Sequence, residues 1–246
     1  MRRELHKVAS IPFTRKSRHD YVSEIDKTCE AEIVREIKRY HPDHAILGEE
    51  SGEQGDSDFV WVIDPLDGTS NYLHGMPHFG ISIALMVKGR TEHAVVYDPM
   101  RDELFTASRG SGAHLNNSRI RVSTRISLDS AILATAFPFR QRGMMGVYTG
   151  IFSEIFRKVE DIRRYGAASL DLAWVAAGRM DAYFEIGLKP WDVAAGALLV
   201  REAGGVVTDF EGNDAVEQSH SVLAAPFKLM TPLRQIIEPR WARAKR

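Results

Sequence analysis

The sequence has few of the features that mark secreted, disulfide-bonded or membrane-spanning proteins. It contains a single cysteine, Cys29, among 246 residues, so a disulfide within the chain and a zinc site built on several thiolates are excluded. The first residues lack the apolar segment of a signal peptide, and the longest apolar runs, such as residues 193–200, are too short to cross a bilayer. These absences predict a cytoplasmic protein with no membrane partner.

An excess of charge of one sign is also missing. The sequence has 32 Lys and Arg against 33 Asp and Glu, a formal net charge of -1, which argues against a protein whose whole surface binds polyanions. Basic residues gather near Arg15 to Arg18 and in residues 240–246. We interpret residues 240–246 as a solvated tail. Repeats and low-complexity segments are absent, and the length is sufficient for one large domain or two small lobes.

Hydrophobic periodicity predicts an α+β first half and an α/β second half. Apolar residues four apart indicate a helix that begins near Ser23 and ends at His41. Short strands are expected over residues 45–47 and 59–63. Strands joined by short turns, as in an antiparallel meander, are expected over residues 79–87, 91–97 and 103–107. Alternating strands and helices are expected over residues 131–137, 169–177, 182–184, 193–203, 206–208 and 222–224. We therefore expect a single unit, 1-246, with lobes 1-125 and 126-246.

The most informative stretch is residues 61–71. An apolar strand is expected to end at Asp64, because the next residue is a proline that cannot donate to the sheet. Asp67 follows three residues later, Gly68 permits close approach of the backbone, and a helix that begins at Thr69 offers its free amides to an anion. Two carboxylates at the end of a buried strand cost free energy unless a positive charge neutralises them. Ligand atoms that are all oxygens favour Mg²⁺, Mn²⁺ or Ca²⁺ over Zn²⁺.

Each candidate residue also has an ordinary structural interpretation. Asp-Pro and Asp-Gly pairs form turns in proteins that bind no metal, and Asp192 stands where an N-cap would begin an apolar helix. Glu49 follows a predicted strand, and it either adds a carboxylate to the site or lies on a surface loop. Asp26 forms a capping box with Ser23, and Lys16 lies in a polar loop where most lysines are solvated.

Taken together, these segments resemble the inositol monophosphatase family, within the lithium-sensitive, magnesium-dependent phosphatases. The resemblance rests on residues 48–51, 61–71 and 191–196, which occur in the family's order. Flanking segments typical of the bacterial members are residues 80–85, 97–99 and 188–191. It extends from about Lys16 to about residue 225, and it implies an α+β or α/β fold, a layered αβαβα sandwich of the sugar-phosphatase type with a site shared between the lobes.

The resemblance also implies roles for individual residues. The ligands of Mg²⁺ would be Glu49, Asp64, the carbonyl group of Leu66, Asp67 and Asp192. Thr69 and Glu49 would orient the attacking water, and Asp26 would support them. Substrate contacts would come from Lys16, Asp67, Gly68, Thr69, Ala168, Glu185 and Asp192, with the phosphate on the amides of Gly68 and Thr69 and the polyol hydroxyls at Ala168 and Glu185.

The implied activity is magnesium-dependent hydrolysis of a small polyol phosphate monoester by a metal-activated water, foremost inositol-1-phosphate to inositol and phosphate. Fructose-1,6-bisphosphatase, histidinol phosphatase and 3'-phosphonucleotide phosphatase activities are alternatives, because they share the metal motifs. Glu185 favours a neutral polyol, since a carboxylate accepts hydrogen bonds from hydroxyls and would repel a second phosphate.

Some bacterial relatives resemble accessory factors of transcription and ribosomal RNA synthesis, so the transcription machinery is an alternative partner, for which the basic residues from Arg240 onward are the motivating feature. The resemblance further implies a homodimer. It also implies an N-terminal helix before Lys16, where this sequence has only a short polar segment. We therefore expect an exposed packing face and lower solubility than in an N-terminally extended form.

Overall fold

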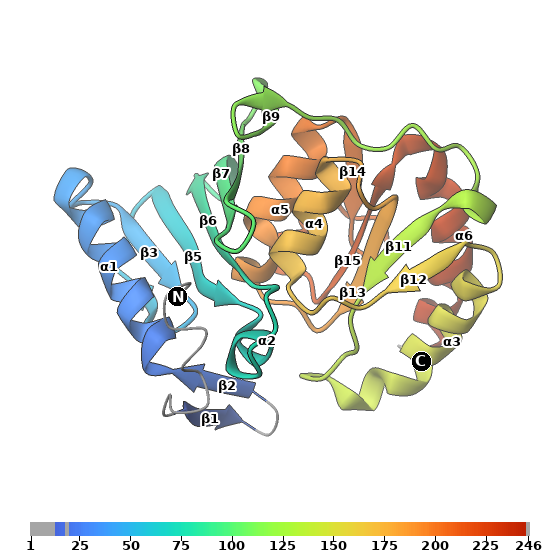
Figure 1. Ribbon diagram of the computed structural model, residues 1–246, viewed down its shortest axis with the longest axis horizontal. Helices are drawn as coiled ribbons and strands as arrows, with labels where there is room; N and C mark the ends of the chain where they lie inside the picture. The colour runs from blue at the N-terminus through green and yellow to red at the C-terminus, as the bar shows by residue number, and fades with distance from the viewer. Residues whose placement is uncertain (1–12, 18–19, 245–246) are drawn as a thin grey trace.

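The computed structural model describes residues 13–17 and 20–244, with side chains from Glu24 to Arg243. Two large β-sheets and three layers of helices alternate across the molecule (Figure 1). From left to right in Figure 1, the layers are helix α1 (Glu24–Tyr40), an eight-stranded sheet, α4 (Ala168–Ala176) with α5 (Pro190–Glu202), a five-stranded sheet, and α3 (Met145–Phe156) with α6 (Phe227–Ala244). This order is the layered αβαβα sandwich that the sequence predicted.

The eight-stranded sheet is mainly an antiparallel meander, as predicted. Its strand order is β10-β9-β8-β7-β6-β5-β3-β4, and only the β3–β5 pair is parallel. The bounds are β3 (Ala45–Gly48), β4 (Gly52–Gln54), β5 (Phe59–Asp67), β6 (Gly80–Val87), β7 (Arg90–Asp98), β8 (Glu103–Ser108), β9 (Gly112–Leu115) and β10 (Ser118–Arg119). A separate hairpin, which the sequence analysis did not predict, pairs β1 (Phe13–Ser17) with β2 (Asp20–Ser23).

The five-stranded sheet is mixed, with the order β12-β11-β13-β15-β14. Its strands are β11 (Ile132–Thr135), β12 (Asp161–Arg163), β13 (Ala182–Ile186), β14 (Gly205–Thr208) and β15 (Ser221–Pro226). All strands of the first sheet precede residue 120 and all strands of this one follow residue 131. The division into lobes at residue 125 lies in the connection between them and stays a prediction.

The helix layer between the sheets is the centre of the apolar core. Every residue of α4 and every residue from Asp192 to Val200 in α5 is buried, which explains why these helices are apolar on all sides. The two helices approach closely at Gly196, where a Cβ atom would lie 2.5 Å from the Cβ of Leu172. In the described part of the chain, no helix combines the length and the apolarity that crossing a membrane requires.

The C-terminal segment differs from the expected solvated tail. Residues up to Ala244 belong to α6, in which Trp241 is buried against Phe210 at 5.3 Å between ring centroids. Arg240 is 3.0 Å from Glu154 of α3, so one of the basic residues is paired on a helix surface. The predicted tail is therefore helical up to Ala244, in a helix that continues through Pro232 and Pro239 although proline usually ends a helix. Residues 245–246 lie outside the described residues.

Two helical glycines, one in the close contact of α4 and α5 and one on α3, are predicted to respond in opposite ways to replacement by alanine. Gly196→Ala should lower the free energy of unfolding by about 1–3 kcal/mol, because the new methyl group meets Leu172. Gly150→Ala in α3 should raise it by about 0.5–1 kcal/mol, because the nearest atom is 3.8 Å away and alanine favours helix. Urea denaturation measures both values, and changes of the same sign would contradict this account of the packing.

Candidate metal centre

The end of β5 carries two of the predicted ligands. Asp64 pairs with Ser82 of β6, but the register then shifts, so that Asp67 pairs with Gly80. In a regular strand, two residues three apart would point to opposite faces of the sheet. This β-bulge contains one extra residue, so Asp64 and Asp67 can point to the same face. The strand therefore continues past Asp64, where the sequence predicted its end, because a bulge tolerates Pro65.

Asp192 reaches the same place from the helix layer between the sheets. It is the third residue of α5, and its Oδ2 accepts the backbone N–H of Lys189 at 2.7 Å. Lys189 is the N-cap residue, so the N-cap interpretation of Asp192 was wrong, although its carboxylate does complete a capping box. Ligand oxygens of Asp64, Asp67 and Asp192 lie within 4.8 Å of one another. The structure thus brings together the three aspartates that the motifs singled out.

Glu49 lines the same pocket from the loop after β3, and a buried glutamate fixes that loop. The carboxylate of Glu30 in α1 accepts the backbone N–H groups of Glu50 and Ser51, each at 2.8 Å. A Cβ atom at Gly48 would lie 2.6 Å from Glu30 Oε1, so a larger residue there would displace the Glu30 carboxylate. The sequence analysis missed Glu30, although its place one turn after Asp26 on α1 is a signal that could have found it.

Thr69 connects the first turn of α2 (Thr69–Leu73) to α1. Its hydroxyl lies 3.1 Å from Asp26 Oδ1 and 3.0 Å from the carbonyl oxygen of Leu66. Asp26 is completely buried, and its contact with Thr69 favours the supporting role that the resemblance implied over a helix cap; the side chain of Ser23 lies outside the described residues. Gly68, with φ of 91°, provides the left-handed turn between β5 and α2.

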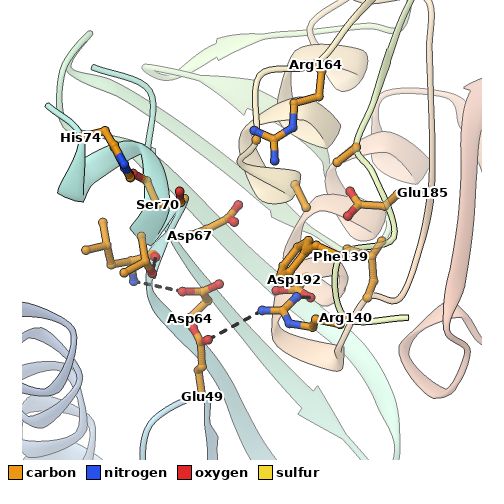
Figure 2. A pocket seen from close by; sticks show the side chains of 17 residues that line it. Glu49, Asp64, Asp67, Ser70, His74, Phe139, Arg140, Arg164, Glu185 and Asp192 are labelled. Carbon is orange, nitrogen blue, oxygen red and sulfur yellow. Dashed lines mark hydrogen bonds and ion pairs between the residues drawn. The ribbon is translucent and has the colours of Figure 1, made fainter. Parts of the chain in front are cut away.

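One cavity of about 290 Å³ is lined by Glu49, Asp64, Leu66, Asp67, Gly68, Thr69 and Asp192. Figure 2 shows Glu49, Asp64 and Asp67 facing Arg140 and Asp192 across it, with Arg164 and Glu185 on the side away from Glu49. The predicted substrate contacts that line it are Asp67, Gly68, Thr69, Ala168, Glu185 and Asp192. Lys16 lies in β1, and its side chain is outside the described residues, so its contact stays a prediction.

The cavity also contains polar and aromatic side chains that the sequence analysis missed, namely Ser70, His74, Phe139, Arg140 and Arg164. Among these, Arg140 enters the carboxylate cluster, with Nη1 3.1 Å from Asp192 Oδ2 and Nη2 3.9 Å from Glu49 Oε1. No motif contains Arg140 or Arg164, and only the fold brings them to the aspartates. A sequence pattern at residues 61–71 could not have indicated them.

The carboxylates of the cluster are buried and repel one another, and both effects raise the pKa values of Asp64 and Asp67. Burial raises the pKa of Asp64 well above its ordinary value, and the neighbouring carboxylates raise it further. Burial and then Asp192 raise the pKa of Asp67 to about 6, although Ser169 opposes this by donating its backbone N–H and its hydroxyl to Asp67 Oδ2. A cation would relieve this repulsion. Because every donor in the cluster is an oxygen, the residues fit a hard divalent cation such as Mg²⁺.

Glu185 is a second buried carboxyl group in the cavity. The hydroxyl of Tyr183 donates a hydrogen bond to it. Burial is the largest influence on Glu185, and together with Asp192 it raises the pKa to about 8, against the opposing effect of Tyr183. In the metal-free protein, Glu185 is therefore largely protonated at neutral pH and can both donate and accept hydrogen bonds.

Comparison with known families identifies the family to which this fold belongs. A model described as the inositol monophosphatase family matches residues 2–243. The chain belongs to the inositol monophosphatase family. The resemblance stated from three sequence segments is thereby confirmed, and members of this family are metal-dependent phosphatases, consistent with the cluster of Asp64, Asp67 and Asp192.

Individual family members agree with this assignment. The chain is 56% identical over 205 residues to Nus factor SuhB of Escherichia coli K12, covering 82% of this chain and 77% of that protein. The crystal structure of extragenic suppressor protein suhB from Bartonella henselae has a TM-score of 0.92 and 42% identity, covering 96% of this chain and 92% of that one. Inositol-monophosphate-bound SaIMPase-II has a TM-score of 0.80 and 30% identity, covering 88% and 85%.

The raised pKa of Glu185 predicts how pH affects the stability of this family member without metal. Because the folded-state pKa of about 8 exceeds the ordinary value of 4.5, the folded state binds the extra proton between these values. The free energy of unfolding should therefore fall as pH rises from about 5 to 8, by at most about 1.4 kcal/mol per pH unit from this group. Glu185→Gln should remove that part of the decline, as urea denaturation in the presence of a chelator would measure.

The exposed Glu36 of α1 provides the matched control for this prediction. Glu36→Gln should leave the pH dependence of the free energy of unfolding as it is in the wild type. If the curves for Glu185→Gln and wild type run parallel from pH 5 to 8, the environment assigned to Glu185 is wrong.

Proposed function

We propose that this protein is a magnesium-dependent phosphatase of small polyol phosphate monoesters, with inositol-1-phosphate as its foremost substrate. The observation that carries the proposal is the convergence of Asp64, Asp67 and Asp192, whose oxygens lie within 4.8 Å of one another in a buried cluster. The cluster would hold Mg²⁺ together with Glu49 and the carbonyl oxygen of Leu66. When bound there, Mg²⁺ would make a water more acidic and compensate the charge of the leaving oxygen.

The chain's own groups would orient the attacking water. A carboxylate only accepts hydrogen bonds, so the Thr69 hydroxyl can donate to Asp26 and keep its lone pairs for a hydrogen of the water. Glu49 would accept the second hydrogen from the other side of the cluster. Asp26, which accepts from Thr69, is buried, and Glu30 accepts the backbone N–H groups of Glu50 and Ser51 next to Glu49. The groups that would orient the water are therefore positioned before substrate binds.

The substrate would lie between α2 and β13. We place its phosphate beside the backbone amides of Gly68 and Thr69, where Asp67 and Asp192 also line the cavity. Its hydroxyl groups would meet Ala168, whose small side chain leaves space, and Glu185, which donates or accepts according to its protonation. Hydrolysis by in-line attack of water needs no covalent intermediate on the enzyme, so positioning and charge compensation supply the catalysis.

The choice among phosphate esters depends less on the charge of Glu185 than the sequence suggested. In the metal-free protein, where its pKa is raised to about 8, Glu185 is a weaker source of repulsion toward a second phosphate, and Arg140 and Arg164 also line the cavity. The support for inositol phosphate is instead family membership and the relative SaIMPase-II, which was solved with inositol monophosphate bound. The sugar, histidinol and nucleotide phosphates remain the alternatives to test.

Phosphate release tests this proposal. Inositol-1-phosphate, fructose-1,6-bisphosphate and a 3'-phosphonucleotide are compared with and without Mg²⁺, for wild type and Asp64→Asn. We expect Mg²⁺-dependent release that favours inositol-1-phosphate, and a loss of kcat/KM of at least about 100-fold in Asp64→Asn. Asp58→Asn, an exposed aspartate near the start of β5, is the matched control and should keep wild-type activity. Folded protein without release from any substrate, or full activity in Asp64→Asn, would refute the proposal.

A second candidate function is an accessory role in transcription. It is supported by the 56% identity to a protein named Nus factor SuhB. Arg240, which first suggested such a role, is paired with Glu154, so the basic segment is weaker support than it was in the sequence. We expect immobilised wild type and Asp64→Asn to capture RNA polymerase or a Nus-type factor equally at low salt, because docking needs no catalysis. Absence of both partners would exclude this role. The homodimer and the cytoplasmic location stay predictions.

A further inference from the structure

Arg140 is a positively charged side chain at one side of the carboxylate cluster. It lies in the connection between β11 and α3, and its guanidinium is 4.7 Å from the ring centroid of Phe139. Nη1 is 3.1 Å from Asp192 Oδ2, and Nη2 is 3.9 Å from Glu49 Oε1. Figure 2 shows the guanidinium between these two groups, on the side of the cavity opposite Asp64. Only 20% of the side chain is exposed, so solvent screens these contacts incompletely.

The two partners of Arg140 come from different layers of the fold. Glu49 follows a strand of the eight-stranded sheet, whereas Asp192 lies in the first turn of α5, in the helix layer between the sheets. A guanidinium keeps its charge at any pH at which the protein is folded, and its planar fork can contact two acceptors at once. Arg140 therefore compensates part of the negative charge at the place where the proposed cation would bind.

We propose that Arg140 is a built-in counter-ion of this cluster, which holds Glu49 and Asp192 in position without metal and lowers the affinity of the cluster for divalent cations. The identity of the cation rests on the proposed function. The lowering follows from Coulomb's law, because a fixed positive charge in contact with two ligands repels a second cation held by the same ligands. If Arg140 had only a structural role, its ion pairs would stabilise the fold without lowering the affinity of the cluster for cations.

Direct titration with Mn²⁺, followed by electron paramagnetic resonance, distinguishes these roles without relying on activity. Arg140→Met removes the charge, Arg140→Gln also removes it but keeps a hydrogen-bond donor for Asp192, and Arg140→Lys keeps the charge. We expect both neutral variants to bind Mn²⁺ about tenfold more tightly than wild type or more, and Arg140→Lys to stay close to wild type. With a chelator, Arg140→Met should melt roughly 5 °C or more below wild type.

Arg142, an exposed arginine two residues further along the chain, is the matched control. Arg142→Met removes the same charge outside the cavity and should change neither Mn²⁺ affinity nor melting temperature. Unchanged or weaker Mn²⁺ binding by folded Arg140→Met or Arg140→Gln would overturn the proposal, even if the wild type is an active phosphatase. Absence of Mn²⁺ binding by the wild type would overturn the proposed function together with it.

Discussion

Repulsion among buried carboxylates is the interaction on which the site depends. Asp64 and Asp67 lie near the C-terminal end of β5, and Asp192 lies in the helix layer between the sheets, yet their oxygens are within 4.8 Å of one another. The burial that raises the pKa values of Asp64 and Asp67 is produced by the stacking of the layers, so the same packing that stabilises the fold creates the demand for a cation. Fold stability and metal binding are thus expected to be linked.

Positions of the candidate ligands are set by backbone features rather than by flexible loops. A bulge in β5 turns Asp64 and Asp67 toward one site, and the capping box of α5 fixes the carboxylate of Asp192. Glu30 holds the backbone next to Glu49 through two amide hydrogen bonds. Such preorganisation matters for phosphate ester hydrolysis, in which positioning and charge compensation supply most of the rate. Strand β5 and helix α5, which carry the three aspartates, contribute residues such as Val62 and Leu198 to the same large apolar core.

The sequence was most informative where chemistry and backbone geometry occupy one short segment. The aspartates of residues 61–71 and Asp192 could be found because each stands at the end of an apolar element, and the order of these segments led to the family. Arg140 could not be predicted, since it reaches the cluster only through the stacking of the five-stranded sheet against α5. Helix α6 was missed because its two prolines interrupt the pattern of a helix whose stability comes from packing of residues such as Trp241.

The most direct test of the central claim is anomalous diffraction from crystals of the wild-type protein grown with Mn²⁺. The account predicts a strong anomalous peak within coordination distance of carboxylate oxygens from Asp64, Asp67 and Asp192, at the junction of β5 and α5. It also predicts that this peak is weaker or absent in crystals of Asp64→Asn grown under the same conditions. Saturating Mn²⁺ that leaves no peak among these three carboxylates, or places its only peaks elsewhere on the molecule, would contradict the account.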